Sequence, residues 1–521
     1  MKKLMMAMGS IICLAVLLSF ITIRHANQPT PTVHITTGYI SGVKSLTSNI
    51  VAYKGIPYAQ PPVGQLRWTA PKLATPWTGV RACTQFGPSP YQGTPVPFSM
   101  WSEEFLIPKA PVSEDCLYLN VWAEAPPVRK KKPVLVWIYG GGFNSGGSAV
   151  PIYDGEAMAR KGIVFVSFNY RVGVFGFFAH PELTRESAHH SSGNYGLLDQ
   201  VAALQWVHQN IAAFGGDPNN VTIAGQSAGS MSVNCLMASP LTKNLFQKAI
   251  AESGAMVAGT ERNENTLQHE EQHGLELAQQ LHATTITDLR NLPAEQLQNT
   301  AKGYNKVIVD GYVLPESVHD CFAAGRQHQV PLLTGWNENE GFLYGSLQNA
   351  AGFKNLAQTL FSNQASVFLK FYPADDEAQA KQSQYNFGRD QHFGMQNYLL
   401  ANQQSTSGQQ QIYVYRFTRK LPATGAYVGY GAFHTGEVPY VYDNLKFVNR
   451  PWEPVDHKLA HTLSAYWANF VKTGNPNSNG LPSWPAYNTQ NHQTMILSEQ
   501  PHAQQMPDKE ALDLLLRKWN K

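Results

Sequence analysis

The segment Gly225–Gly229, with the sequence G-Q-S-A-G, has the spacing expected around a serine nucleophile. It follows the apolar run Val221–Ala224, which is typical of a buried strand, and precedes a stretch from Ser230 that suits a helix. A G-x-S-x-G sequence between a strand and a helix indicates a sharp turn that exposes the serine hydroxyl above a sheet. A plain glycine-rich turn is the alternative, but the position between two such elements favours a catalytic Ser227.

A serine hydroxyl is a weak nucleophile near neutral pH, so it needs a general base and donors for the oxyanion of the reacting carbonyl. Residues 139–143, with the sequence Y-G-G-G-F, directly follow the apolar run Val134–Ile138. Three glycines leave backbone N–H groups unshielded, as an oxyanion requires, although a tight turn without a ligand has the same composition. The two segments together indicate acyl transfer.

A third pattern points to different chemistry. His269-Glu270-Glu271-Gln272-His273 matches the H-E-x-x-H sequence of zinc peptidases, in which a helix places both histidines on one face and the first glutamate acts as a base. The longer metzincin pattern fails, because Glu276 stands in place of its glycine and Gln279 in place of its third histidine. An ordinary surface helix is the favoured interpretation, with a zinc peptidase acting through His269, Glu270 and His273 as a minor alternative.

Strands and helices are predicted to alternate along the chain from about Pro133, and they would position the serine turn and the glycine-rich segment. Short, mostly apolar runs are typical of parallel strands buried on both faces. They are predicted at Val134–Tyr139, Val164–Phe168, Val221–Ala224, Lys248–Ala251, Val330–Thr334 and Ile412–Phe417, with a helix at Leu197–Ile211 and earlier β-rich runs at Val33–Ile35 and Val51–Tyr53. We therefore predict a single α/β domain over residues 27–521, with a large central, mostly parallel sheet flanked by helices and an N-terminal β-rich segment.

The first 26 residues are expected to lie outside this domain. Lys2 and Lys3 precede the uncharged stretch Leu4–Ile23, which is longer than the core of a usual signal peptide and just long enough to span a bilayer. Residues 1–26 are thus predicted to be a signal peptide or an N-terminal membrane anchor. The lysines favour a cytoplasmic N-terminus, with the body secreted, periplasmic or anchored outside the cytoplasm.

Composition and net charge exclude several other classes of protein. Hydrophobic residues make up 43% of the 521-residue chain and charged residues 14%, which argues against a disordered chain or a coiled coil. The formal net charge is +3, so binding to nucleic acid is not expected.

In an oxidising compartment, a disulfide between Cys83 and Cys116 would close a loop of about 33 residues.

Several segments together resemble the type-B carboxylesterase family, the cholinesterase-like branch of the α/β-hydrolases. They occur in the family's order over most of the exported chain: residues 53–59 (YKGIPYA), 114–120 (EDCLYLN), 169–173 (NYRVG), 193–200 (GNYGLLDQ), 214–218 (FGGDP) and 251–254 (AESG), besides the serine pentapeptide. The resemblance implies an α/β-hydrolase fold and the hydrolysis of a small-molecule carboxylic ester through an acyl-enzyme.

The resemblance also implies a catalytic triad. Ser227 would be the nucleophile, and His434, in the sequence G-A-F-H-T-G-E, would be the base that takes its proton. Glu340, in N-E-G, would fix the tautomer of the imidazole and stabilise the imidazolium; Glu338 lacks the following glycine. The resulting order of serine, acid and histidine is that of α/β-hydrolases.

By the same resemblance, the backbone amides of Gly141, Gly142 and Ala228 would form the oxyanion hole. Cys83 and Cys116 would form the family's first disulfide. No metal and no organic cofactor are expected, and the resemblance leaves the oligomeric state open.

Two positions bear on the substrate. Gln226 stands where cholinesterases carry a glutamate, and the loss of this negative charge weakens the case for a cationic choline substrate. Trp101 faintly resembles the tryptophan on which choline stacks, but its spacing to Cys116 differs, so a tryptophan of the core or rim is favoured. An esterase other than a cholinesterase is predicted. The main alternative is a non-catalytic adhesion or interaction module of the same family, although Ser227, Glu340 and His434 are all present.

Overall fold

The computed structural model describes residues 32–125, 130–258, 265–343 and 346–520. The predicted signal peptide or anchor at residues 1–26 lies outside the described residues. Within the described part, none of the helices combines the length and the apolar character that crossing a membrane requires.

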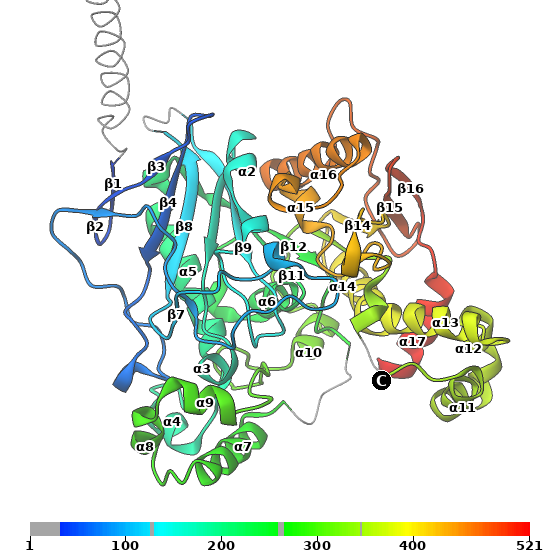
Figure 1. The fold of residues 1–521 in the computed structure, drawn as a ribbon, viewed down its shortest axis with the longest axis horizontal. Coiled ribbons are helices and arrows are strands. Elements are labelled where there is room, and N and C mark those ends of the chain that lie inside the picture. The colour runs from blue at the N-terminus through cyan, green and yellow to red at the C-terminus, as the bar shows by residue number, and fades with distance from the viewer. Residues whose placement is uncertain (1–31, 126–129, 259–264, 344–345, 521) are drawn as a thin grey trace, which may run out of the picture.

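A sheet of eleven strands runs through the molecule (Figure 1). Their order across the sheet is β16-β15-β14-β13-β12-β11-β9-β10-β8-β4-β3. The strands comprise β3 (Val43–Lys44), β4 (Ile50–Pro57), β8 (Tyr118–Glu124), β9 (Lys132–Ile138), β10 (Val164–Phe168), β11 (Gly216–Gln226), β12 (Lys248–Glu252), β13 (Leu332–Asn337), β14 (Ile412–Phe417), β15 (Gln493–Leu497) and β16 (His502–Gln505). The neighbours from β10 to β15 pair in parallel, whereas β8, β4 and β3 at one edge and β16 at the other pair antiparallel.

The predicted strands are all present, and several differ from their apolar runs at the ends; the largest extensions are in β4, β11 and β13, the last of which begins at Leu332 rather than Val330. β11 begins at Gly216 because Gly216 pairs with Lys132 of β9, and the register shifts before the apolar run begins at Val221. β13 continues to Asn337, which pairs with Phe417 of β14. Backbone hydrogen bonds extend both strands beyond the residues that hydrophobicity marks.

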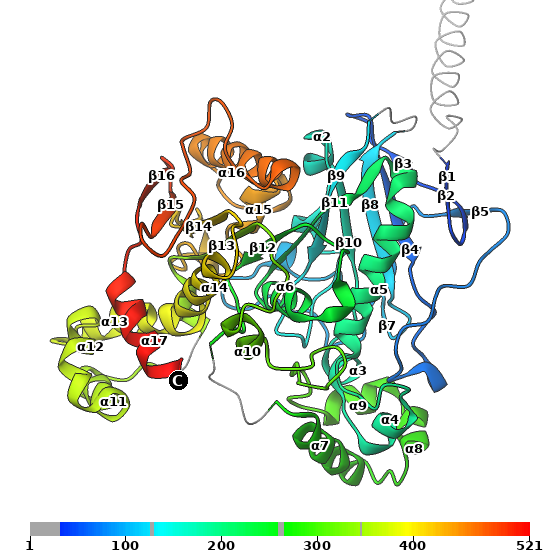
Figure 2. The same ribbon diagram turned by 180° about the vertical axis from the view of Figure 1, so that it is seen from behind.

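Helices cover both faces of the sheet (Figures 1 and 2). On the face turned to the viewer in Figure 2 lie α5 (Tyr195–Asn210), α6 (Ala228–Ala238), α10 (Val318–Ala323) and α14 (Met395–Thr406), and on the opposite face lie α2 (Glu156–Arg160), α15 (Val438–Val441) and α16 (Pro454–Thr473). This arrangement explains why strands β9 to β14 are buried on both faces.

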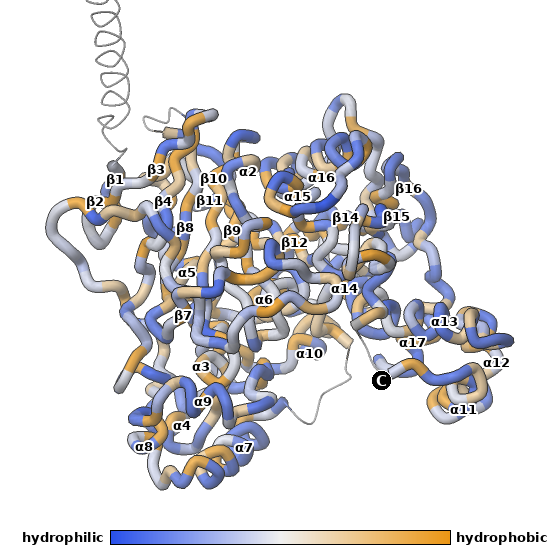
Figure 3. Tube along the Cα trace, in the orientation of Figure 1, coloured by the Kyte–Doolittle hydropathy of each residue, from blue (hydrophilic) through white to orange (hydrophobic). Residues whose placement is uncertain are grey.

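Further helices form two groups at the periphery (Figure 1). One group comprises α3 (Gly173–Phe177), α4 (Pro181–Glu186), α7 (Leu267–Gln280), α8 (Ile286–Asn291) and α9 (Ala294–Thr300); the other comprises α11 (Ala350–Phe361), α12 (Ala365–Phe371), α13 (Glu377–Arg389) and α17 (Lys509–Trp519). The first group has a small apolar core of its own, to which Phe178, Leu277 and Leu289 belong. Figure 3 shows hydrophobic residues along the central strands and hydrophilic stretches along the outer helices.

The N-terminal segment is β-rich, as predicted. The strands β1 (Thr32–Ile35), β2 (Gly38–Ser41) and β5 (Val80–Ala82) form a three-stranded sheet, and β6 (Ser89–Pro90) pairs with β7 (Val112–Ser113). Among the described residues, the first α-helix is α2, which begins only at Glu156.

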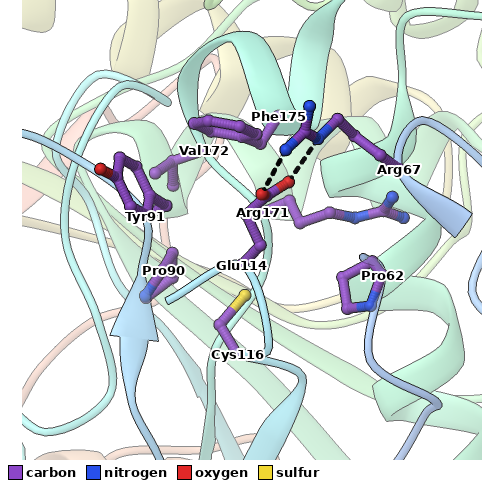
Figure 4. Close-up of a pocket in the computed structure, with 9 residues that line it drawn as sticks. All are labelled: Pro62, Arg67, Pro90, Tyr91, Glu114, Cys116, Arg171, Val172 and Phe175. Carbon is purple, nitrogen blue, oxygen red and sulfur yellow. Dashed lines mark hydrogen bonds and ion pairs between the residues drawn. The ribbon is translucent and has the colours of Figure 1, made fainter. Parts of the chain in front are cut away.

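The predicted disulfide is not formed: Cys83 and Cys116 are both buried free thiols. The backbone of Cys83 bonds to Ser41 and Lys54, whereas Cys116 precedes β8 and lines a small pocket beside Arg171 and the Arg67–Glu114 ion pair (Figure 4). Burial raises the pKa of Cys83 to about 11 and that of Cys116 well above its usual range. Burial therefore keeps both sulfurs in the protonated, unreactive thiol form.

Candidate active site

The groups singled out in the sequence all follow parallel strands at their carboxyl ends. The glycines at 140–142 follow β9, Ser227 follows β11, Glu340 follows β13, and the loop carrying His434 follows β14. Because parallel strands share one carboxyl edge, groups from remote parts of the chain converge above it.

Ser227 lies on a strained turn between β11 and α6. Its backbone has φ 59° and ψ −124°, which places a non-glycine residue in a sparsely populated region. Its N–H donates to the carbonyl of Glu252, and its carbonyl accepts from Met231, both at 2.9 Å. A Cβ on Gly229 would lie 2.1 Å from the carbonyl oxygen of Ile138, so only glycine allows α6 to approach β9 this closely.

His434 and Glu340 form a buried pair. Nδ1 of His434 lies 2.8 Å from Oε1 of Glu340, and the exposed fractions of the two residues are 4% and 0%. The second carboxylate oxygen of Glu340 accepts the backbone N–H of Asn337 at 3.0 Å. Glu340 is thus held on both oxygens, and it keeps the Nδ1 proton of a neutral imidazole on its own side, leaving Nε2 as the acceptor.

Glu338 has different partners. Its carboxylate accepts hydrogen bonds from Arg389 and Arg416, both at 2.9 Å. The structure therefore separates the two neighbouring glutamates into one that faces His434 and one that belongs to an ion-pair network.

The amide of Gln226 lies against the imidazole, a contact that sequence reasoning missed. Its Nε2 is 3.1 Å from Nε2 of His434 and 3.3 Å from Nδ1, while its Oε1 accepts from the hydroxyl of Thr435 at 3.3 Å. Among the described residues, Ser227 has no hydrogen bond to His434. Hydrogen bonds of this kind often form only when substrate is present. In this structure the Gln226 amide occupies the position beside Nε2 of His434.

Two aromatic side chains enclose the imidazole. Phe393 stacks on it with ring centroids 4.6 Å apart, from the π-helical segment Asp390–Gly394 between α13 and α14. Trp101 meets it edge-on at 6.4 Å and donates its indole N–H to Thr435 at 3.3 Å. Trp101 is therefore a rim residue of the site, and no signal in the sequence pointed to Phe393.

The glycine loop after β9 presents free donors. Gly141 has φ 114°, and a Cβ there would lie 2.3 Å from the carbonyl oxygen of Ser145, so the turn requires glycine. Within the described part of the chain, nothing accepts the N–H groups of Gly141 or Gly142. Ala228 is the first residue of α6, and its N–H has no acceptor inside the helix. Three N–H groups without an acceptor in the described part of the structure are thus available, two in the glycine loop and one at the start of α6, directly after Ser227.

Two further buried carboxyl groups lie beneath the site. Burial raises the pKa of Glu252 to about 8, although the indole N–H of Trp467, 2.7 Å away, favours its charged form. Burial, together with the charges of Glu252 and Glu340, holds the pKa of Glu437 well above its usual range. Burial therefore favours the neutral carboxylic acid at both Glu252 and Glu437.

A cavity of about 740 Å³ opens onto these residues. It is lined by Ser227, His434, the glycines at 140–142 and mainly apolar side chains, among them Val96, Phe98, Trp101, Phe105, Leu106, Ile107 and Val150. None of the lining residues described is Asp, Glu, Lys or Arg. A site of this volume and lining suits a small, uncharged organic molecule.

The histidines of the zinc-peptidase pattern do not belong to this cavity. His269, Glu270 and His273 lie together on α7, with their nitrogen and oxygen atoms within 4.8 Å of one another. No residue of α7 is among those that line the cavity. The peptidase interpretation therefore finds no support in the geometry around Ser227.

Comparisons with known proteins identify the family and relatives of this chain. The sequence pattern of the Carboxylesterase family matches residues 29–515. The para-nitrobenzyl esterase of Bacillus subtilis (strain 168) is 36% identical over 492 residues, which cover 91% of this chain and 97% of that protein. The Fumonisin B1 esterase of Sphingopyxis macrogoltabida is 35% identical over 474 residues, covering 87% and 84%, and the Liver carboxylesterase 1 of Oryctolagus cuniculus is 32% identical over 538 residues, covering 93% of each.

A solved structure of a PNB esterase superposes with a TM-score of 0.80 at 32% identity, covering 93% of this chain and 99% of the other. The predicted α/β-hydrolase fold is thereby confirmed, and so is the resemblance from which it was inferred.

Proposed function

This chain belongs to the carboxylesterase family and is a carboxylesterase of type B, and we propose that it acts through an acyl-enzyme on Ser227, with His434 as general base and Glu340 as the acid of the triad. The observation that carries the proposal is the buried pair of His434 and Glu340, 2.8 Å apart, beside the cavity that opens onto Ser227. In this arrangement the imidazole has the tautomer that a general base requires.

In the proposed reaction, Nε2 of His434 takes the proton of Ser227 as the serine oxygen attacks the ester carbonyl. The carbonyl oxygen becomes an oxyanion, which the N–H groups of Gly141, Gly142 and Ala228 stabilise. His434 then gives the proton to the leaving alcohol as the C–O bond breaks. A water molecule, deprotonated by the same nitrogen, attacks the acyl-enzyme and releases the acid and the free serine.

The substrate we propose is a neutral, small-molecule ester. No charged side chain lines the described part of the cavity apart from the titratable imidazole of His434, so a charged substrate would lose its hydration without gaining a partner. Gln226 makes the site less suited to a cationic ester, because an amide carries no charge to attract one.

Hydrolysis of p-nitrophenyl butyrate by the wild type and by Ser227→Ala tests this function. We expect the wild type to release p-nitrophenol in a reaction that EDTA does not inhibit, and Ser227→Ala to lose it. A fluorophosphonate probe should label the wild type on Ser227. An active, unlabelled Ser227→Ala variant would contradict the assignment, and an inactive wild type would favour the interaction module.

We also propose that the catalytic body acts outside the cytoplasm, because residues 1–26 combine two lysines with a long apolar stretch. Fractionation of cells that express the full chain tests this. We expect the esterase activity outside the cytoplasm, and in the cytoplasm when residues 1–26 are deleted.

A further inference from the structure

We propose that His269, Glu270 and His273 form a binding site for a divalent transition-metal ion of the zinc class, and that its occupancy acts on the glycine loop of the active site. The three side chains offer two imidazole nitrogens and one carboxylate oxygen, and these atoms all lie within 4.8 Å of one another. Two imidazoles and a carboxylate are a donor set that Zn²⁺ takes with a fourth position open to water.

The helix brings the donors to one place. His269 and His273 are four residues apart on α7, so they share a face, and their ring centroids are 4.6 Å apart. Nδ1 of His273 lies 3.3 Å from Oε2 of Glu270. His269 and His273 are both at least partly exposed, so both rings have room to turn toward a common ion.

Glu270 is the unusual member of the cluster, because only 3% of it is exposed. Its Oε1 accepts no hydrogen bond from the described residues, and the nearest charged group to this oxygen among them is Nζ of Lys306, 3.4 Å away. A buried carboxylate that accepts no hydrogen bond on one oxygen, and faces only a half-exposed lysine there and an imidazole on the other oxygen, has capacity for a closer cation. A divalent ion would bind Glu270 in place of Lys306.

The helix that carries the cluster is held firmly. A Cβ on Gly274 would lie 2.0 Å from the carbonyl oxygen of Ala179. The backbone of α7 therefore packs against the segment that precedes α4 so closely that only glycine fits at this position. Thr266 caps the helix by accepting the N–H of His269. The donors therefore start from a fixed backbone, which lowers the cost of assembling a metal site.

Residues 304–306 connect the cluster to the active site. The hydroxyl of Tyr304 donates to the carbonyl of His273 at 2.7 Å, Lys306 pairs with Glu270, and the side-chain amide of Asn305 donates to the carbonyl of Gly142 at 2.7 Å. A divalent ion on Glu270 would repel Lys306 and displace Asn305, which lies next to it. Because the oxyanion donors act only when correctly placed, we expect metal binding to lower turnover; this second step rests on the proposed function.

Isothermal titration of the full chain with ZnCl₂ tests the site without any use of activity. We expect one Zn²⁺ per chain, at least tenfold weaker binding in Glu270→Gln, and loss of the site in the double variant His269→Ala/His273→Ala. His457 and His461 on α16 form a matched control, since they are also exposed and four residues apart; His457→Ala/His461→Ala should keep the site. No binding to the wild type, or loss of binding in the control instead, would overturn the proposal.

The connection to the active site is tested by p-nitrophenyl butyrate turnover with and without saturating ZnCl₂. We expect at least a threefold fall in the wild type and in the His457/His461 control, and none in His269→Ala/His273→Ala. Asn305→Ala should still bind Zn²⁺ but lose the response. Binding by titration with unchanged turnover would refute the connection alone, whereas an enzyme without any turnover would refute the proposed function and leave the titration result standing.

Discussion

Replacing Glu340 with glutamine keeps the size of the side chain, removes its charge and should move a proton on His434 from one ring nitrogen to the other. One carboxylate oxygen accepts the backbone N–H of Asn337 at 3.0 Å, and the other faces Nδ1 of His434 at 2.8 Å. A main-chain N–H can only donate, so the new amide oxygen must face Asn337 and the amide NH₂ must face His434. Nδ1 then has to accept, and the proton moves to Nε2.

The consequence is a histidine that cannot act as a base, because Nε2 is the atom that must receive the proton of Ser227. In a triad of this kind, the wrong tautomer costs about 10⁴-fold in kcat, or about 5 kcal/mol of transition-state stabilisation. We therefore expect kcat for p-nitrophenyl butyrate to fall by about four orders of magnitude, with KM little changed.

The matched control is Glu338→Gln, two residues away. Its carboxylate pairs with Arg389 and Arg416 rather than with His434, so we expect kcat within about threefold of the wild type and a lower Tm. If Glu340→Gln keeps more than a tenth of the wild-type kcat, or if both variants lose activity alike, the reasoning from the tautomer is refuted.

Three other substitutions probe the surroundings of the triad. Gln226→Glu places a negative charge about 3 Å from the imidazole and so favours the imidazolium. The acid limb of the kcat/KM profile should then move to higher pH by about one unit; an unmoved limb would contradict the contact. The pKa of Glu252 is raised to about 8 in the folded protein, so stability should fall as pH rises from about 4.5 to 8. Glu252→Gln should remove a fall of up to about 5 kcal/mol, or about 5 °C in Tm; equal slopes of Tm against pH in the two proteins would disprove this. Gly229→Ala places a Cβ 2.1 Å from the carbonyl oxygen of Ile138, so kcat should fall at least about 100-fold as the turn is displaced; wild-type turnover and Tm would show that the turn tolerates the change.

The strands of the central sheet could be predicted from sequence because they are buried on both faces, and hydrophobicity alone marks them. The polar start of β11 and the end of β13 could not, because backbone pairing with Lys132 and Phe417 extends them. The pairing state of Cys83 and Cys116 could not be predicted from their spacing either, because a separation along the chain does not fix the distance between two sulfurs in space.

The sequence likewise predicted some residues of the candidate site and missed others. Local sequence predicted the turn at Ser227, and the family resemblance pointed to Glu340 and His434, whose approach depends on segments far apart in the chain. The amide of Gln226 and the ring of Phe393 reach the imidazole through tertiary packing, and no periodicity or motif records such contacts.

The convergence of loops from β11, β13 and β14 has a consequence for the order of synthesis. These strands leave the ribosome one after another. The segment that carries Ser227 is therefore synthesised before His434, the proposed base. A nascent chain that ends before β14 therefore contains a complete serine turn but no hydrolytic activity. Release of p-nitrophenol during translation would therefore show that synthesis has passed β14 and reached at least His434, so activity depends on a nearly complete chain.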